Sequence, residues 1–179
     1  LHTGSHQGRG FDVMLSQVAE SLTRIIDESP GGAVLALENA AGQGGVIGSS
    51  FAELGTILKT VASPRLEICL DTCHAFAAGY DLSDAKALDA VLTEFDDEIG
   101  LDHLVVLHAN DSMMELGEHR DRHDNIGDGE IGTDGFKVMM EQPALQGRPW
   151  LLEVPGIEGD GPDLENVNRL KQIRDGVLG

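Results

Sequence analysis

Four short apolar segments of this chain each end in side chains that ligate divalent metal ions. They are LALEN with Glu38, EICLDTCH with Asp71 and His74, VVLHAND with His108, and WLLEV with Glu153. Short apolar runs of this kind are typical of buried strands, and the carboxyl ends of parallel strands in a β/α fold all face the same side. Residues that are far apart in the sequence would therefore meet at one place.

Segments with helical periodicity alternate with these strands. The predicted strands cover residues 33–37, 66–70, 103–107 and 149–154, and the predicted helices cover 11–29, 51–61, 84–99 and 162–177, with a further short helix capped by Thr133 or Asp134. This regular alternation with short connections predicts one α/β domain, residues 1–179, built on a parallel sheet.

The predicted architecture is a TIM (β/α)8 barrel, of which this chain carries a part. A closed barrel usually takes about 250 residues, and the chain has 179. Because the sequence starts at Leu1 and His2 already reads as a strand end, we expect about five parallel strands of an N-terminally truncated barrel. The open edges of such a sheet carry unpaired backbone groups, which predicts self-association of the chain.

The chain carries a formal net charge of −19 and contains four lysines. An average surface of this sign repels nucleic acid, whose phosphates are normally contacted by Lys and Arg. The acidity fits either a salt-adapted organism or an ordinary acidic cytosolic protein. No apolar stretch reaches membrane-spanning length and no signal peptide is recognisable, so we expect a cytoplasmic protein without a membrane partner.

A further segment, DRHDNIGDGEIG, contains Asp121 and His123 two residues apart. In an extended segment both side chains would leave the same face, which suits a shared metal ion. Alone, this tripeptide would read as an ordinary surface sequence, so its weight comes from the ligand-type residues that end the strands. Together they predict a multi-metal catalytic site, with zinc favoured by the mixture of His and carboxylates and manganese as the alternative.

The remaining metal-ligating residue types have simpler interpretations. Cys69 and Cys73 flank Asp71 in CLDTC. Cys73 is either a ligand or a small side chain packed in a reduced core, and packing is the favoured interpretation. His6, His103 and His119 are expected to be structural or surface residues.

Five motifs in a fixed order cover the chain from His2 onward: ENAAGQGG, CLDTCHAFAAGYDL, LHANDS, DRHDNIGDGEIG and LLEVPG. This series resembles the endonuclease IV family of apurinic/apyrimidinic endonucleases. The resemblance implies a TIM barrel with three zinc ions that hydrolyses the phosphodiester 5′ to an abasic site in double-stranded DNA, an activity of base excision repair.

The resemblance also implies eight metal ligands in three sites: His2 for the first, Glu38 between the first and second, Asp71, His108 and Glu153 for the second, and His74, Asp121 and His123 for the third. Thr3 stands where the family motif usually has proline. A ninth ligand, a histidine at the end of an earlier strand, has no counterpart in this chain. We therefore expect two complete metal sites and an incomplete first one.

Catalytic and substrate roles follow from the same resemblance. Glu38 and Glu153 would hold the metal ions that activate the attacking water. Gly42 and Gly44, in the first long loop, would let the backbone approach DNA closely. Asn110 is a weaker candidate for a substrate contact; with Asp111 it either orients imidazoles or forms a turn.

Two other functions compete with a DNA repair endonuclease. One is a non-catalytic metal-binding fragment of such an enzyme. The other is a sugar isomerase of the related metal-dependent barrel group, which also carries Glu, Asp and His at strand ends. The segment with Asp121 and His123 argues against the isomerase, because a third metal ion has no place in that chemistry.

Overall fold

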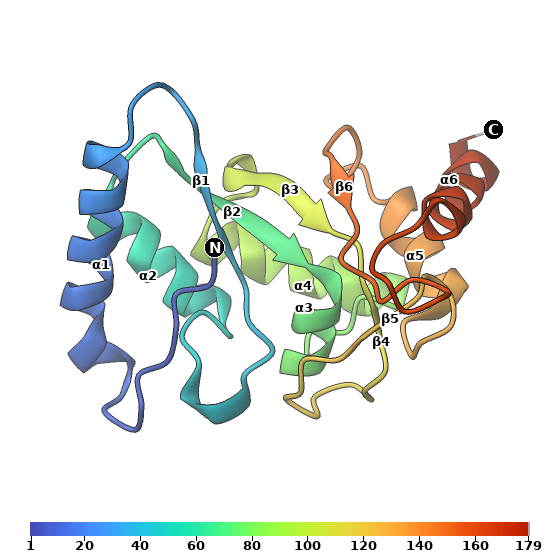
Figure 1. The fold of residues 1–179 in the computed structure, drawn as a ribbon, viewed down its shortest axis with the longest axis horizontal. Coiled ribbons are helices and arrows are strands. Elements are labelled where there is room, and N and C mark those ends of the chain that lie inside the picture. Colours follow the sequence, from blue (N-terminus) through green and yellow to red (C-terminus); the bar gives the residue numbers. More distant parts are fainter. Residues whose placement is uncertain (179) are drawn as a thin grey trace.

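A four-stranded parallel sheet forms the centre of the chain, of which the computed structural model describes residues 1–178. Its strands lie in the order β1 (Leu35–Glu38), β2 (Leu66–Asp71), β3 (Leu104–His108) and β6 (Trp150–Leu151). All neighbouring pairs are parallel and follow the chain order (Figure 1). This is the arrangement of consecutive units of a (β/α)8 barrel, so the predicted fold class is confirmed.

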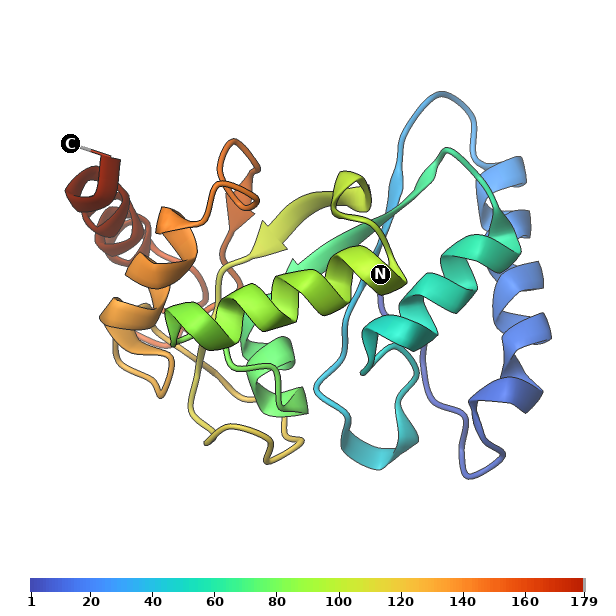
Figure 2. The same ribbon diagram turned by 180° about the vertical axis from the view of Figure 1, so that it is seen from behind.

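Five helices form a row along one side of this sheet. They are α1 (Phe11–Glu28), α2 (Phe51–Val61), α4 (Ala85–Glu98), α5 (Gly132–Glu141) and α6 (Leu164–Leu178), and each contacts the next in this order. Figure 2 shows α2 and α4 in front of the strands from this side, whereas Figure 1 shows the sheet from its uncovered side. No described helix is both long and apolar enough to cross a bilayer.

Local capping explains where α2 and α4 begin. The Ser50 hydroxyl accepts a hydrogen bond from the Glu53 N–H at 3.3 Å, and the Glu53 carboxylate accepts one from the Gly48 N–H at 2.7 Å. Asp84 caps α4 in the same way. Such side-chain acceptors satisfy N–H groups that have no partner within the helix. Apolar residues at helical spacing then turn inward, and the predicted helices over 51–61 and 84–99 are confirmed. The expected cap of the short helix, Thr133 or Asp134, was wrong, because α5 begins at Gly132 after Ile131 and has no side-chain cap.

The core lies between the sheet and this row of helices. Leu37, Ile68 and Leu107 from the strands pack against large side chains from the helices, such as Phe51 and Phe95, and all of them are buried. Hydrophobic burial is thus concentrated on the side of the sheet that faces the helices. The polar residues that end the strands are left at the edge of the core.

Three expectations about strands and helices were wrong. The expected first strand, ending at His2, is reduced to Leu1, which donates to the Ala36 carbonyl and accepts from the Glu38 N–H; Thr3 then turns to bond Ile47. The sheet therefore has four strands where five were expected. The last strand covers only Trp150–Leu151, so Glu153 lies in the following loop. A short helix, α3 (Thr72–Ala78), was not expected.

Self-association of the chain through its open sheet edges stays a prediction.

Two glycine-to-alanine substitutions test how closely α2 and α4 pack. A Cβ added at Gly55 would strike the Glu98 backbone carbonyl, whereas a Cβ added at Gly176 in α6 meets nothing within 4 Å. We expect Gly55→Ala to lower the free energy of unfolding by about 1–3 kcal/mol. Gly176→Ala should raise it by up to about 1 kcal/mol, because alanine favours the helix. Urea unfolding of both variants measures this; equal effects would contradict the packing.

Candidate metal centre

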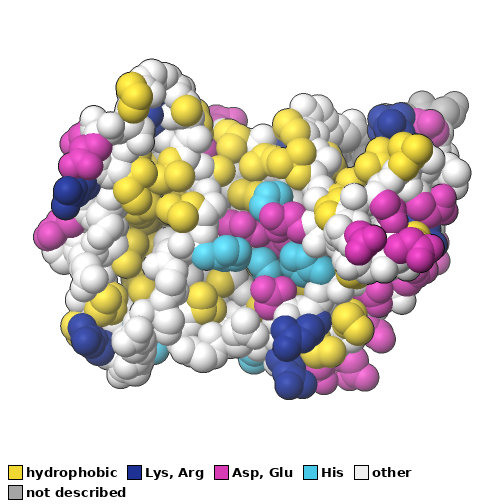
Figure 3. All heavy atoms as spheres, in the orientation of Figure 1, with side chains coloured by type: hydrophobic (Ala, Val, Ile, Leu, Met, Phe, Trp, Pro, Cys, Tyr) yellow, Lys and Arg dark blue, Asp and Glu magenta, His cyan; other side chains and the backbone are white. Residues whose placement is uncertain are grey.

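The predicted ligands lie together at the carboxyl end of the sheet. Figure 3 shows His and acidic side chains gathered at the centre of one face. Their potential ligand atoms fall into groups in which all atoms lie within 4.8 Å of one another. Three of these groups contain all eight predicted residues: His2, Glu38 and His74; Glu38, Asp71, His108 and Glu153; and His74, Asp121 and His123.

The group of His74, Asp121 and His123, called here the three-residue group, has the most regular geometry. The two imidazole Nε2 atoms are 3.3 Å apart, and the Asp121 carboxylate oxygens lie 3.2 Å from His74 Nε2 and 3.3 Å from His123 Nε2. Ligands at zinc-type distances around a tetrahedral ion are separated by about 3.3 Å. The spacing of these donors fits a small divalent ion.

The group of Glu38, Asp71, His108 and Glu153, called here the four-residue group, joins the ends of β1, β2 and β3 to the loop after β6. His108 Nδ1 lies 2.9 Å from Glu38 Oε1, 3.2 Å from Glu153 Oε2 and 3.8 Å from Asp71 Oδ2. The parallel register pairs Asp71 with His108, which explains why these two side chains meet. Three carboxylates and one imidazole suit a divalent cation.

The group around His2 differs from the prediction. His2 Nε2 lies 3.4 Å from Glu38 Oε2, as expected, but His74 Nδ1 also lies 3.5 Å from Glu38 Oε1. The rings of His2 and His74 are 5.3 Å apart. The structure therefore places His74 beside this group, although its Nδ1 bonds the Asn39 carbonyl and its Nε2 belongs to the three-residue group. Glu38 belongs to two groups, which is the position expected of a bridging carboxylate.

Two asparagines hold this arrangement, and one of them was missed in the sequence. Asn39 Oδ1 accepts from the Asp71 N–H at 2.6 Å, and its Nδ2 donates to the Asp71 carbonyl at 3.1 Å. Asn110 Nδ2 donates to Asp71 Oδ2 at 2.6 Å, while its Oδ1 accepts from the Glu153 N–H. Because Asn110 has no exposed surface, its side chain positions carboxylates, and the expected substrate contact finds no support. The signal for Asn39 was its place directly after Glu38.

Backbone carbonyls fix the orientation of two imidazoles. His74 Nδ1 lies 3.1 Å from the Asn39 carbonyl oxygen, and His123 Nδ1 lies 3.2 Å from that of Glu153. A carbonyl oxygen can only accept, so Nδ1 carries the proton and Nε2 of the neutral ring presents a lone pair. This is the arrangement that metal-binding histidines commonly show.

The two buried carboxylates respond differently to their surroundings. Burial opposes the charged form of Glu38, but the hydrogen bond with His108 and the nearby His2 outweigh it, so the pKa of Glu38 is lowered. Asp71 is completely buried, and burial raises its pKa although His74 lies close. Their ion-pair partners among the described residues are histidines. The centre thus concentrates negative charge with little besides imidazole to balance it.

The imidazoles compensate by holding protons. Burial acts to lower the pKa of His74, yet the hydrogen bond with Asp121 and other nearby carboxylates raise it to about 9. The Cys69 thiol and the Glu38 carboxylate raise the pKa of His108 to about 11. In the chain alone, imidazolium groups therefore supply the positive charge that a divalent ion would supply in their place.

The structure explains why glycines occupy two positions of the first loop, which the sequence alone did not reveal. Gly42 has φ 90°, and a Cβ there would lie 2.7 Å from His119 Nδ1; Gly45 has φ 72°, and a Cβ there would lie 2.7 Å from His6 Cε1. Two histidine rings thus pack on this loop, in agreement with the structural role expected for His6 and His119. Gly44, with φ 60°, has free space beside it and stays the better candidate for close approach of a ligand.

Cys73 lies with Asp71 and His123 in a fourth group of potential ligands. Burial raises the pKa of its thiol to about 12, so the thiol stays protonated at neutral pH. Its sulfur donates to the Arg122 carbonyl at 3.5 Å. Both cysteines are free and buried, as the packing interpretation expects.

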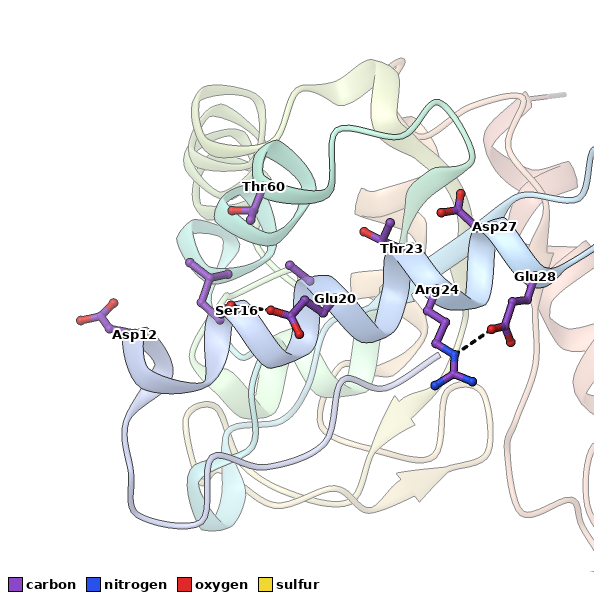
Figure 4. Close-up of a pocket in the computed structure, with 10 residues that line it drawn as sticks. Asp12, Ser16, Glu20, Thr23, Arg24, Asp27, Glu28 and Thr60 are labelled. Carbon is purple, nitrogen blue, oxygen red and sulfur yellow. Dashed lines mark hydrogen bonds and ion pairs between the residues drawn. The ribbon is translucent and has the colours of Figure 1, made fainter.

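A groove along α1 offers no comparable chemistry. Figure 4 shows its polar side chains spread along the helix, with local pairs such as Arg24 Nε and Glu28 Oε1 at 2.8 Å. This helix lies at one edge of the molecule, away from the centre of the face that carries the histidines. The groups at the strand ends are therefore the candidate site.

Comparison with known proteins places this fold. The profile of the family described as "Xylose isomerase-like TIM barrel" matches residues 1–177. The chain belongs to this family. Within this barrel family, proteins named probable endonuclease 4 from Halothermothrix orenii and Geotalea daltonii are 43% and 44% identical to it, over 96% and 99% of the chain. Each match covers 62% of the relative, so the chain spans about three fifths of the length of these curated relatives.

A solved structure agrees with these sequence matches. The crystal structure of endonuclease IV from Thermus thermophilus superposes with a TM-score of 0.75 at 34% identity, over 90% of this chain and 58% of that protein. The resemblance to the endonuclease IV family is therefore confirmed. The four strands and their helices form part of the TIM barrel of that family.

Metal binding to this centre should release protons. With pKa values of about 9 and 11, His74 and His108 are protonated near neutral pH in the metal-free chain. An ion binds the neutral ring, so affinity for Zn²⁺ should increase as the pH rises from about 6 toward 9. Calorimetric titration in buffers of different ionisation enthalpy should show about two protons released per chain. Affinity that does not change over this range would contradict the assignment.

Proposed function

We propose that this chain is the metal-binding part of an endonuclease that hydrolyses the phosphodiester 5′ to an abasic site in double-stranded DNA. The observation that carries the proposal is the three-residue group, whose donor atoms are separated by 3.2–3.3 Å, beside the four-residue group. An isomerase has no use for this additional group. A phosphodiesterase does, because charge develops on several phosphoryl oxygens at once.

The relatives support this reading. Those reported above bear the names probable endonuclease 4 and endonuclease IV. Because the chain spans 62% of the curated relatives, the activity of the whole protein is part of the proposal. A role in DNA repair and an abasic-site substrate are likewise parts of the proposal.

The residues present fit zinc, with manganese as the alternative, because their donors are imidazole nitrogens and carboxylate oxygens only. When bound, such ions supply an activated water and neutralise phosphoryl charge. His74, Asp121 and His123 would hold one ion. Glu38 would hold a second together with Asp71, His108 and Glu153, and would share a weaker one with His2. Asn39 and Asn110 keep Asp71 and the Glu153 backbone in place while substrate binds.

Arginines near the centre can attract phosphate. Arg120 and Arg122 are exposed and flank Asp121 in the sequence, and Arg9 is exposed in the loop before α1. None of the three takes part in an ion pair among the described residues, unlike Arg24, Arg169 and Arg174. Figure 3 shows basic side chains beside the histidine cluster. In a chain of net charge −19, local positive charge gives DNA a place to approach the acidic centre.

Incision of an oligonucleotide duplex with one abasic site tests the proposal. The chain, loaded with Zn²⁺ or Mn²⁺, should cut the strand 5′ to the abasic site and leave a matched undamaged duplex intact. Chelation should stop the reaction. A chain that binds metal but fails to cut would be a metal-binding fragment without this function.

Substitution of two carboxylates tests the assignment of ligands. Glu38→Gln and Glu153→Gln keep side-chain volume but remove a charged ligand, so incision should fall by at least about a hundredfold. Glu38 is buried, with 5% of its side chain exposed, whereas Glu153 is 52% exposed. Glu153→Gln should therefore leave the melting temperature unchanged. Near-normal cleavage by either variant would refute the assignment.

Replacement of Arg120 and Arg122 tests the phosphate contacts. The variant Arg120→Gln/Arg122→Gln should bind DNA more weakly at low salt, and the slope of log K against log salt should decrease by about two. The matched control is Lys86→Gln/Lys137→Gln, which removes two exposed cations from α4 and α5. Fluorescence anisotropy at several salt concentrations measures both. Equal loss in the two double variants would show that net charge alone matters.

A further inference from the structure

The second half of the motif DRHDNIGDGEIG has no ligand-type role in the groups above. Its residues 125–132, called here the NIGDGEIG loop, follow His123 and the short strand β5 (His123–Asp124). In the structure, four backbone N–H groups of this loop point to one side chain, the carboxylate of Asp111: those of Gly127 at 2.9 Å, Gly129 at 3.2 Å, Ile131 at 3.0 Å and Gly132 at 3.2 Å. Asp111 has no exposed surface.

The glycines of the loop are the residues that this arrangement requires. Gly127 and Gly132 have φ 86° and 65°, a conformation that favours glycine. A Cβ at Gly129 would lie 2.6 Å from Asp111 Oδ1 and would also strike the Ser112 carbonyl oxygen. The loop thus has the backbone shape that its bonds to Asp111 require. The chain between Asp111 and the loop contains Asp121 and His123.

No described Lys or Arg forms an ion pair with Asp111. Burial raises the pKa of its carboxyl, and the N–H groups of the loop act against this effect. Several N–H donors around one carboxylate can stabilise a buried negative charge. These hydrogen bonds also stabilise the loop, because the Asp111 carboxylate accepts from N–H groups that would otherwise lack a partner.

Asp111 is also connected to the metal centre. It lies in β4 (Asp111–Ser112), which pairs with β5 so that Ser112 faces His123, and the Met113 N–H donates to the Arg122 carbonyl at 2.9 Å. The backbone of His123 is thus held by this ladder, and after Asp124 the chain continues into the NIGDGEIG loop that the Asp111 carboxylate anchors. The four-residue group stands on β1, β2, β3 and the loop after β6. Its link to this segment is the side chain of Asn110, which bonds Asp71 and the Glu153 N–H, whereas the Asp111 carboxylate bonds none of its four residues.

We propose that Asp111 is a positioning residue for the three-residue group: by fixing the NIGDGEIG loop, it holds His123 Nε2 at the distance from His74 and Asp121 that a metal ion needs. The proposal rests on the proposed function in one respect, namely that this group binds metal. Loss of Asp111 should weaken this group selectively and leave the four-residue group able to bind.

Asp111→Asn tests this with Asp128→Asn as the matched control. The first variant places an amide donor against loop N–H donors, whereas the second removes a charge of the same loop that pairs with Arg169 at 2.8 Å on the surface. In the metal-free chain, hydrogen exchange at Gly127, Gly129, Ile131 and Gly132 should be at least about tenfold faster in Asp111→Asn only.

Zn²⁺ titration then separates the two groups, with the imidazole ¹⁵N resonances of His123 and His108 as reporters. Asp111→Asn should weaken binding at His123 by about 10–100-fold, the usual effect of removing a residue that orients a ligand. Binding at His108 should change less than about twofold. If Asp111→Asn does not fold, Gly129→Ala, which crowds the same carboxylate, should give the same selective loss.

Three outcomes would overturn the proposal. Unchanged binding at His123 would show that Asp111 does not position it. Equal weakening at His123 and His108 would show general destabilisation only. If neither histidine of the unsubstituted chain responds to Zn²⁺, the proposed function itself fails, and the positioning role for metal falls with it.

Discussion

The carboxylate of Asp71, buried where β2 ends, connects the sheet to the whole candidate metal centre. Its Oδ1 accepts from the His74 N–H at 2.8 Å, which begins α3 and sets the direction of that imidazole. Its Oδ2 accepts from Asn110 Nδ2 and lies 3.8 Å from His108 Nδ1. One buried charge thus fixes a helix start, a neighbouring strand end and a ligand. A buried carboxylate of this kind persists only where hydrogen bonds and opposite charge compensate its lost hydration.

This compensation explains why the centre favours a cation. Asp71 and Glu38 are buried, and histidines are their described ion-pair partners. Protonated His74 and His108 balance the carboxylates in the chain alone, and a divalent ion can replace those protons. The hydrophobic core packs against the strands that end in these ligands, and the hydrogen bonds of Asn39 and Asn110 hold Asp71 in place without an ion.

Much of this could be predicted from sequence. The apolar runs that end in Glu38, Asp71 and His108 are local signals, and parallel pairing makes their convergence a matter of geometry. The hydrogen bonds that support the ligands could not be predicted, because they join residues that are distant in the sequence. Asn39 bonds Asp71 from 32 positions away, and Asp111 bonds Gly127 to Gly132 from 16–21 positions away. No periodicity reveals such pairs. The short helix α3 was missed because one capping aspartate, rather than an apolar pattern, starts it.

Anomalous X-ray diffraction at the zinc absorption edge, from crystals of the chain grown with Zn²⁺, tests the central claim most directly. The account predicts one anomalous peak among His74, Asp121 and His123 and a second among Glu38, Asp71, His108 and Glu153. A peak at His2 should be weaker. Peaks only at surface residues, with these two groups still joined by direct hydrogen bonds, would contradict the account.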